Sequence, residues 1–458
     1  MGERDFRGFL DVLRRAGELV EVDEPISAVH ELARRVDASE AAENRAFLFR
    51  RVIGHTGPVA AGLYGSTHRH LLGLRLRGMA EFADRLDAAI RQPLPPVIER
   101  GEAPCQEVRF PAEAGLDRLP IPTLSTGDGG PYVTSGVVAL RDGSRRNAGV
   151  YRMQVHGPRR LTILTNRFHD GHRILDAALA AGRTVDVAIS IGVDPAVFVS
   201  AFWPVAPGIE EFAVAGALLG QPLVLAPATT IDLEVPAHAE IVIEGRIRPG
   251  SEETEGPFAD ITGQITGAGR QPVIDVTAIT TRRDPVFHSV LAFNSREHFK
   301  SRRNDFWRDY QATGRVRLPG LPEEVLGTTY RLYFPPSARN FHAVVAIAKR
   351  DDEQPRRLIQ AMFETYRYLK RVVVVDDDID IRDPLQVEWA QATRVGRPAQ
   401  ITLTRGFGSR IDTSADEEDG QVVKMGIDAT VPRAQEKEIL GPGVREDSTY
   451  ISQEGAIP

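Results

Sequence analysis

Hydrophobic residues near the start of the chain recur at helical intervals. One set falls at the three- and four-residue spacing of a single helix face: Phe6, Phe9, Leu10 and Leu13. Gly17 follows where the helix is predicted to stop. Ser27 stands where an N-cap would open a second helix, on which Leu32 and Val36 share a face.

Proline and glycine mark the end of this first part of the chain. They cluster at 94–96 and again at 101–104, and such clusters favour a boundary between domains. A length of 458 residues gives a prior of about three domains. We therefore expect an N-terminal α/β region over residues 1–108.

Short apolar runs separated by glycine and proline dominate residues 109–318. Segments 186–191 and 273–279 are examples of predicted strands, and one helix is expected over about 210–219. Many short strands with this punctuation predict a barrel or a compact antiparallel sheet.

The pattern returns to alternating strands and helices over residues 319–458. A strand over 342–348 precedes a helix over about 356–368, and a second strand follows over 371–375. This alternation predicts a parallel sheet with packed helices. The fold class expected for the whole chain is mixed α/β.

Composition and charge exclude several classes of function. Hydrophobic residues at 42% and charged residues at 26% describe an ordinary globular protein. A net charge of -7 argues against nucleic-acid binding, which needs a basic face. A single cysteine, Cys105, rules out an internal disulfide and fits a reducing cytoplasm. The charged N-terminus and the lack of an 18-residue apolar run predict neither a signal peptide nor a membrane partner.

Two carboxylates flank a Gly-Pro turn in the segment 255–260, EGPFAD. Residues five apart share a face on neither a helix nor a strand, so only a bend would aim Glu255 and Asp260 at one point. Converging acids tend to push their pKa values apart, which leaves one as a proton carrier. A solvated loop that happens to carry two acids is the alternative.

A second segment, 147–155, places Arg152 on a half-buried strand. From Val150 the residues alternate, so that Tyr151, Met153 and Val155 share one face and Arg152 lies on the other. If that other face is also covered, the guanidinium needs an anion. A carboxylate substrate, a phosphate or an acidic side chain would each serve.

Together these two segments resemble the signatures of the UbiD family of decarboxylases, which use prenylated flavin mononucleotide (FMN). The chain has NAGVYR at 147–152 where the family has Asn-x-Gly-x-Tyr-Arg, and EGPFAD at 255–260 in place of Glu-Gly-Pro-(Phe/Tyr)-x-(Asp/Glu). Segments 233–245, 375–380 and 424–430 are also similar to the family. The resemblance implies a split β-barrel flavin domain over 109–318 and a C-terminal α/β oligomerisation domain over 319–458.

The resemblance also implies a metal site. Asn147, His169 and Glu211 match the family's metal ligands in order and in most separations, with His172 as the rival histidine. Their mostly oxygen donor set suits Mn²⁺ or Mg²⁺ better than structural zinc. A divalent ion held by three protein groups leaves room for a cofactor phosphate. In the family K⁺ lies beside the divalent ion, and backbone carbonyls near 200–203 are the candidates here.

The cofactor site implied by the resemblance spans several segments. Its expected members are Asn147, Ala148, Gly149, Val150, Tyr151, Arg152, Phe168, His169, Glu211 and Lys424. A flavin prenyltransferase would supply the cofactor, and the assembly would be a homodimer or a higher homo-oligomer.

The implied function is reversible, non-oxidative decarboxylation of an α,β-unsaturated or (hetero)aromatic carboxylic acid, which releases CO₂. Arg152 would hold the carboxylate, Glu255 would protonate the carbon that CO₂ leaves, and Asp260 would tune both. Two other functions stay open: a flavin-independent metal hydrolase that uses the same ligand set, and a non-catalytic relative that binds prenylated FMN.

Overall fold

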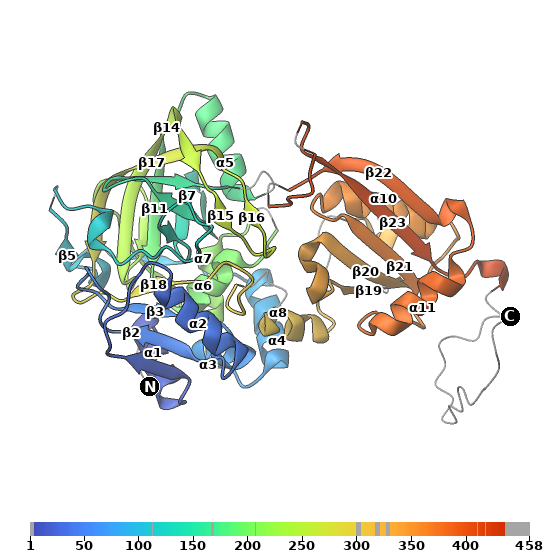
Figure 1. Cartoon of the computed structure of the whole chain (residues 1–458), viewed down its shortest axis with the longest axis horizontal. Coiled ribbons are helices and arrows are strands. Elements are labelled where there is room, and N and C mark those ends of the chain that lie inside the picture. Colours follow the sequence, from blue (N-terminus) through green and yellow to red (C-terminus); the bar gives the residue numbers. More distant parts are fainter. Residues whose placement is uncertain are drawn as a thin grey trace. The chain divides into compact units, whose positions relative to one another are not determined.

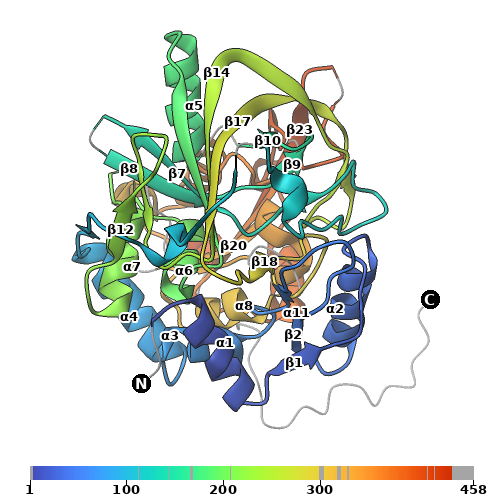
Figure 2. The same ribbon diagram turned by 90° about the vertical axis from the view of Figure 1, so that its left-hand side faces the viewer.

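The computed structural model describes residues 4–111, 113–143, 145–165, 169–206, 208–298, 304–316, 321–326, 330–409, 411–416 and 418–435. They form a mixed α/β architecture, as the sequence predicts (Figures 1 and 2). The chain divides into two compact units. The large unit is Met1–Arg315 with Ile411–Thr413, and the C-terminal unit is Val316–Arg410 with Ser414–Pro458.

The start of the large unit folds as helices against a four-stranded sheet. Its elements are α1 (Phe6–Arg15), β1 (Leu19–Val22), α2 (Glu31–Ala41), β2 (Ala46–Phe49), β3 (Val59–Ala61), α3 (Thr67–Leu74) and α4 (Met79–Arg91). The predicted apolar face of α1 is buried, and Gly17 follows the helix with a φ of 72°. The fourth strand, β18 (Phe287–Ser289), comes from much later in the chain and pairs with β3.

The expected N-cap at Ser27 is wrong. Helix α2 begins at Glu31 with His30 as the preceding residue. Val29 forms a bridge with Thr123 and the His30 amide donates to the Thr123 carbonyl, so the helix begins only after this pairing, and His30 has a φ of 63°. The Ser27 hydroxyl instead accepts from the Val29 amide.

A nine-stranded antiparallel sheet forms the centre of the large unit. Its order is β6-β9-β10-β17-β14-β11-β7-β8, and β5 pairs with β17. The strands are β5 (Val108–Arg109), β6 (Tyr132–Val133), β7 (Val137–Asp142), β8 (Arg145–Val150), β9 (Met153–Val155), β10 (Arg160–Ile163), β11 (Val185–Ile191), β14 (Ile241–Glu255) and β17 (Gly269–Thr281). A two-stranded hairpin of β15 (Phe258–Ala259) and β16 (Ile265–Thr266) follows β14, and β12 (Val224–Pro227) joins β13 (Glu234–Pro236) and β4 (Val97–Ile98) in a small sheet.

The pattern of residues 109–318 predicted one helix in this region, which is too few. The described residues contain α5 (Asp170–Ala180), α6 (Pro195–Phe202), α7 (Glu211–Leu219) and α8 (Asp305–Ala312). Helix α7 lies where it was predicted. Almost every residue of α6 is buried, so this helix has no polar stripe from which its period could be read.

Helices cover both faces of the central sheet. On one face, Ile189 and Ile243 belong to the same cluster as Ile174 of α5. On the other face, Ala188 and Val242 pack in a cluster with residues of α6 and α7. Burial on both faces explains why the central strands read as continuous apolar runs.

The C-terminal unit contains a five-stranded sheet of order β19-β20-β21-β23-β22. Its elements are α9 (Glu323–Leu326), β19 (Tyr330–Tyr333), β20 (His342–Ile347), α10 (Gln354–Thr365), β21 (Arg371–Asp376), α11 (Pro384–Arg394), β22 (Ile401–Phe407) and β23 (Gln421–Ala429). Strands β20, β21 and β23 are parallel, which confirms the prediction, whereas the outer strands are antiparallel to their neighbours.

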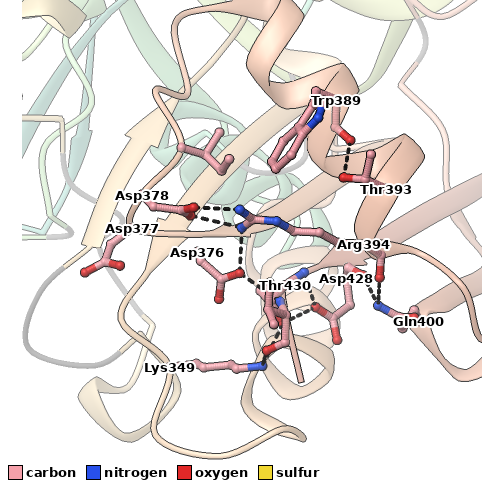
Figure 3. Close-up of polar contacts among 12 residues, drawn as sticks. Lys349, Asp376, Asp377, Asp378, Trp389, Thr393, Arg394, Gln400, Asp428 and Thr430 are labelled. Carbon is pink, nitrogen blue, oxygen red and sulfur yellow. Dashed lines mark hydrogen bonds and ion pairs between the residues drawn. The ribbon is translucent and has the colours of Figure 1, made fainter. Parts of the chain in front are cut away.

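Charged side chains close the carboxyl end of this parallel sheet (Figure 3). Arg394, at the end of α11, donates to Asp376 and to both oxygens of Asp378, and its guanidinium lies 5.0 Å from the centre of the Trp389 ring. Asp376 also accepts from the Val431 amide. The network therefore ties α11 and β21 to the chain that leaves β23.

No helix among the described residues combines the length and the apolar character that a membrane crossing requires.

Candidate active site

Arg152 lies in the short connection between β8 and β9, and its guanidinium joins two acidic side chains. Its Nη2 donates to Glu255 Oε2 at 3.1 Å, and its Nε lies 3.0 Å from Glu255 Oε1. Its Nη1 donates to Asp260 Oδ2 and, at 3.3 Å, to the Thr266 hydroxyl. The guanidinium lies 4.5 Å from the centre of the Phe258 ring.

The bend after β14 brings the two acids together. Glu255 is the last residue of β14, and Gly256 follows with a φ of 96°, a backbone state that favours glycine. The chain then forms the β15–β16 hairpin, whose turn carries Asp260. Both acids and Arg152 are almost completely buried. The structure thus places Arg152, Glu255 and Asp260 in direct contact.

Four side chains or backbone groups that the sequence analysis missed hold this bend. The Tyr132 hydroxyl donates to Glu255 Oε1 at 3.1 Å. Gln154 accepts from the Gly256 amide at 2.8 Å, and Asp128 accepts from the Ala259 amide at 2.8 Å. The Gly129 amide donates to the Pro257 carbonyl at 2.8 Å. These residues are 102 to 131 positions away in the chain from the groups they hold, so no local pattern points to them.

Charge is unbalanced at this buried group. One guanidinium faces two carboxylates, and a buried site relieves such an excess by binding a proton. Burial raises the pKa of Asp260 despite the opposing effect of Arg152, and the charge of Glu255 raises it further. Burial, followed by the charge of Glu255, also raises the pKa of the Tyr132 hydroxyl, which therefore stays a donor.

A second polar group forms where β8 meets the start of α7. Glu211, the first residue of α7, accepts from Asn147 Nδ2 at 2.9 Å and from the Ala148 amide at 2.9 Å. Among the described residues, none bonds the buried Oδ1 of Asn147. An amide oxygen that is buried beside a carboxylate and left without a donor fits a metal ligand.

Neighbouring residues reinforce this contact. Arg146 donates to Glu210 at 2.6 Å, so consecutive residues of β8 meet consecutive residues at the start of α7. Burial raises the pKa of Glu211 to about 7. A cation would return this carboxyl to its charged form.

His169 directly precedes α5, whose first turn lies close to Asn147. A Cβ at Gly171 would clash with the Tyr151 hydroxyl and would lie 3.4 Å from Asn147 Oδ1. The rings of His169 and Tyr151 have their centres 6.1 Å apart. His172, the rival ligand, shares a 2.9 Å hydrogen bond with the Thr165 hydroxyl through its Nδ1.

The remaining predicted cofactor residues are distributed differently. Ala148, Gly149 and Val150 continue β8 beyond Asn147. Phe168 lies outside the described residues. Lys424 belongs to β23 of the C-terminal unit, where its ammonium donates to the carbonyls of Arg367 and Leu369 and burial lowers its pKa to about 8.

The described part of the chain shows no second metal site built from acidic, histidine or cysteine side chains. Within it, no group of three or more His, Cys, Asp or Glu side chains is placed to hold a metal ion. The trio of Asn147, His169 and Glu211 contains only two residues of those types. Ser200 and Trp203, near the carbonyls considered for K⁺, lie at the end of α6, where the Trp203 amide donates to the Ser200 carbonyl at 3.3 Å.

Family models match most of the chain. The N-terminal, Rift-related and C-terminal domains of 3-octaprenyl-4-hydroxybenzoate carboxy-lyase match residues 10–88, 97–294 and 310–429 respectively. The Rift-related domain contains Asn147, Arg152, Glu211, Glu255 and Asp260.

Solved structures of UbiD-class enzymes are similar over almost the full length. HmfF from Pelotomaculum thermopropionicum, solved with FMN, is 35% identical with a TM-score of 0.78, over 95% of this chain and 96% of that chain. An evolved dimeric form of the same enzyme, solved with prenylated FMN, is 33% identical with a TM-score of 0.77, over 96% and 99%. Vanillic acid decarboxylase from Sedimentibacter hydroxybenzoicus, in a closed form, is 25% identical with a TM-score of 0.83, over 100% and 96%. The chain belongs to the UbiD family, whose relatives include decarboxylases.

Proposed function

We propose that this protein is a reversible, non-oxidative decarboxylase of an α,β-unsaturated or (hetero)aromatic carboxylic acid. The observation that carries the proposal is the buried contact of Arg152 with Glu255 and Asp260. Such a group offers a cation for a substrate carboxylate beside an acid pair that can hold a proton. The membership of the UbiD family supports the same reaction class.

The side chains where β8 meets α7 have the chemistry to hold a divalent metal ion and, through it, a flavin phosphate. Asn147 Oδ1 and Glu211 supply oxygen donors suited to Mn²⁺ or Mg²⁺, and His169 would complete the set. K⁺ would bind nearby through backbone carbonyls. The β8 residues Ala148, Gly149, Val150 and Tyr151 would line the cofactor site, and Lys424 and Phe168 are proposed to contribute as well. Prenylated FMN, made by a flavin prenyltransferase, would accept the electrons that CO₂ leaves behind.

The chain's own residues would orient the acid and supply the proton. The planar guanidinium of Arg152 pairs with carboxylates through two parallel hydrogen bonds, so it would fix the orientation of the substrate carboxylate. Glu255 and Asp260 would carry the proton to the carbon that CO₂ leaves. The raised pKa of Asp260 favours this residue as the resting position of the proton, with Glu255 as the donor to carbon.

We propose that the two parts of the fold have different tasks. The central antiparallel sheet would be the family's split-barrel flavin domain, and the C-terminal unit would serve for assembly. Apolar side chains on one face of β22 and β23 are exposed in the single chain: Ile401, Leu403, Val423 and Met425. Leu403 and Met425 are direct cross-strand partners, so these residues form a continuous surface.

We expect a stable homo-oligomer, because closed symmetric assemblies would bury this surface. Light scattering should give at least twice the chain mass of 50.3 kDa at micromolar concentration. Leu403→Asp should lower that mass, whereas Leu385→Asp should not, since Leu385 is equally exposed but lies on α11. A monomeric parent protein would contradict the assignment.

Replacing Glu211 by alanine is expected to abolish retention of flavin and divalent metal. The change removes a proposed ligand and also frees the Asn147 amide and the Ala148 N–H. Because Glu211 must be charged to bind a cation and its pKa is about 7 in the metal-free protein, metal retention by the parent should weaken as the pH falls below 7.

Glu244→Ala is the matched control for this change. Glu244 is fully buried and accepts from the Thr229 and Thr230 amides, but it has no proposed role in the site. Metal content and flavin absorbance, measured on folded protein, distinguish the two variants. Equal flavin content in Glu211→Ala and the parent would remove Glu211 from the cofactor site.

One experiment tests the proposed function as a whole. The chain is co-expressed with a flavin prenyltransferase, and a panel of aromatic, heteroaromatic and acrylic acids is scored by CO₂ release. Release from at least one acid, and none from protein made without the prenyltransferase, is the expected result. Hydrolysis without flavin would favour the metal hydrolase, and a flavin-loaded protein inactive on the whole panel would favour a binding role.

A further inference from the structure

We propose that Tyr132 is a positioning residue for the acid pair, a role that rests on the proposed function of Glu255 and Asp260. Glu255 is held at both carboxylate oxygens. Arg152 donates to Oε2, and the Tyr132 hydroxyl donates to Oε1 at 3.1 Å. With both oxygens fixed, the plane of the carboxylate cannot turn without breaking a hydrogen bond.

The surroundings of Tyr132 suit this role. The residue is fully buried, and its ring packs against Phe258 with ring centres 4.5 Å apart. Phe258 also lies under the guanidinium of Arg152. One aromatic ring therefore contacts both groups that hold Glu255.

The chain segment that precedes Tyr132 holds the same bend from its other side. Asp128 accepts from the Ala259 amide, and the Gly129 amide donates to the Pro257 carbonyl. The Tyr132 hydroxyl lies within 3.4 Å of the Pro257 carbonyl as well. Residues 128–132 thus contact the bend at its backbone and at the Glu255 side chain, which fixes the carboxylate relative to Asp260.

The sign of the expected pH effect follows from the charges around Glu255. Charged or titratable groups of three elements face Glu255: Arg152 from the β8–β9 connection, Asp260 from the hairpin turn and Tyr132 from β6, with Asp128 beyond Tyr132. A hydroxyl that donates to a carboxylate stabilises its charged form. Without the Tyr132 hydroxyl, the acid pair of Glu255 and Asp260 should therefore lose its proton at a higher pH.

Tyr132→Phe tests the proposal, because it removes the hydroxyl and keeps the ring. We expect turnover to fall by about tenfold to a hundredfold, the range of one hydrogen bond to a charged group. Flavin content and KM should stay close to those of the parent. The alkaline limb of the pH–rate profile should move to higher pH, a shift that a purely structural role would not cause.

Tyr64→Phe is the matched control. Tyr64 is equally buried in the large unit, and no described residue bonds its hydroxyl. This variant should keep the turnover and the pH profile of the parent. Thermal unfolding of both variants shows whether the fold is kept. If Tyr132→Phe has the same turnover and pH profile as Tyr64→Phe, the positioning role is wrong.

A second measurement does not depend on activity. Infrared difference spectra recorded against pH contain a protonated carboxyl band, and Asp260→Asn together with Glu255→Gln identifies the part that comes from the acid pair. This part should persist to higher pH in Tyr132→Phe than in the parent and in Tyr64→Phe. If this band shifts to higher pH in Tyr132→Phe but the parent releases no CO₂, the contact is supported and the proposed reaction is rejected. If the parent is active and the band of Tyr132→Phe disappears at the same pH as that of the parent, only the role of Tyr132 is rejected.

Discussion

Glu255→Gln is expected to abolish turnover while the cofactor stays bound. The substitution keeps the shape of the side chain but removes the proton that the acid pair would deliver. Loss of a general acid typically lowers the rate by about 10² to 10⁴-fold. We expect a loss beyond this range, since the same change also disturbs Arg152.

The structure explains the additional loss. Glu255 accepts from Tyr132 at one oxygen and from Arg152 at the other. A glutamine has only one acceptor oxygen, so its NH₂ group must face one of these two donors. If the NH₂ group faces Arg152, the arginine contact is lost; if it faces Tyr132, the tyrosine hydroxyl must turn from donor to acceptor. In both cases the charge of Glu255 beside Arg152 is lost.

Two further variants make the result specific. Glu240→Gln is the matched control, because Glu240 is a fully buried glutamate that pairs with Arg7 and Arg282 in the same unit but outside the site. Glu240→Gln should lower the free energy of unfolding and leave turnover almost unchanged. Asp260→Asn should also lose activity, because it removes the proposed resting position of the proton. Turnover of Glu255→Gln within about tenfold of the parent would mean that Glu255 is not the proton donor.

The sequence predicted the groups whose positions depend on local chain geometry. The Gly-Pro bend predicted that Glu255 and Asp260 converge, and the alternation from Val150 predicted that Arg152 lies opposite Tyr151. Glu255 and Asp260 do converge on Arg152, and Tyr151, Met153 and Val155 do share one apolar cluster. The expected continuous strand is wrong, because β8 ends at Val150 and β9 begins at Met153, which leaves Arg152 in the connection between them. The parallel strands β20 and β21 were predicted from the alternation of strands and helices for the same local reason.

Features that depend on distant pairing could not be predicted in this way. Tyr132 contacts Glu255 across 123 positions of the chain, and a lone tyrosine after Gly-Gly-Pro has no distinguishing pattern. Helix α6 was missed because it is buried all round, so its sequence has no amphipathic period. The N-cap at Ser27 failed because a bridge to Thr123, far away in the sequence, overrides the local capping preference.

Arg152→Met is expected to prevent the substrate from engaging the site at all. Methionine fills a similar volume without charge, so the substrate carboxylate loses the cation that orients it. Truncation of one partner in a buried charge pair costs about 2–5 kcal/mol of binding. Mixing the flavin-loaded variant with substrate should therefore leave the flavin spectrum unchanged, whereas the parent spectrum should change.

The same substitution should destabilise the large unit in a pH-dependent way. Without Arg152, the buried carboxylates of Glu255 and Asp260 lose the guanidinium that contacts both of them. An uncompensated buried charge costs about 3–5 kcal/mol. The loss should be largest at neutral pH and smaller in acid, where the carboxyls take up protons and the repulsion disappears. Unfolding midpoints of the variant and the parent, measured across this pH range, test the sign.

Arg394→Met is the matched control for Arg152→Met. It shows which effects come from losing any buried arginine and which come from losing Arg152 itself. Arg394 also bridges two aspartates and lies over an aromatic ring, but in the C-terminal unit (Figure 3). It should lower the unfolding midpoint and leave the response of the flavin spectrum to substrate intact, when both are measured below that midpoint. If Arg152→Met responds to substrate as strongly as Arg394→Met does, another group holds the carboxylate, and the central assignment of the site is wrong.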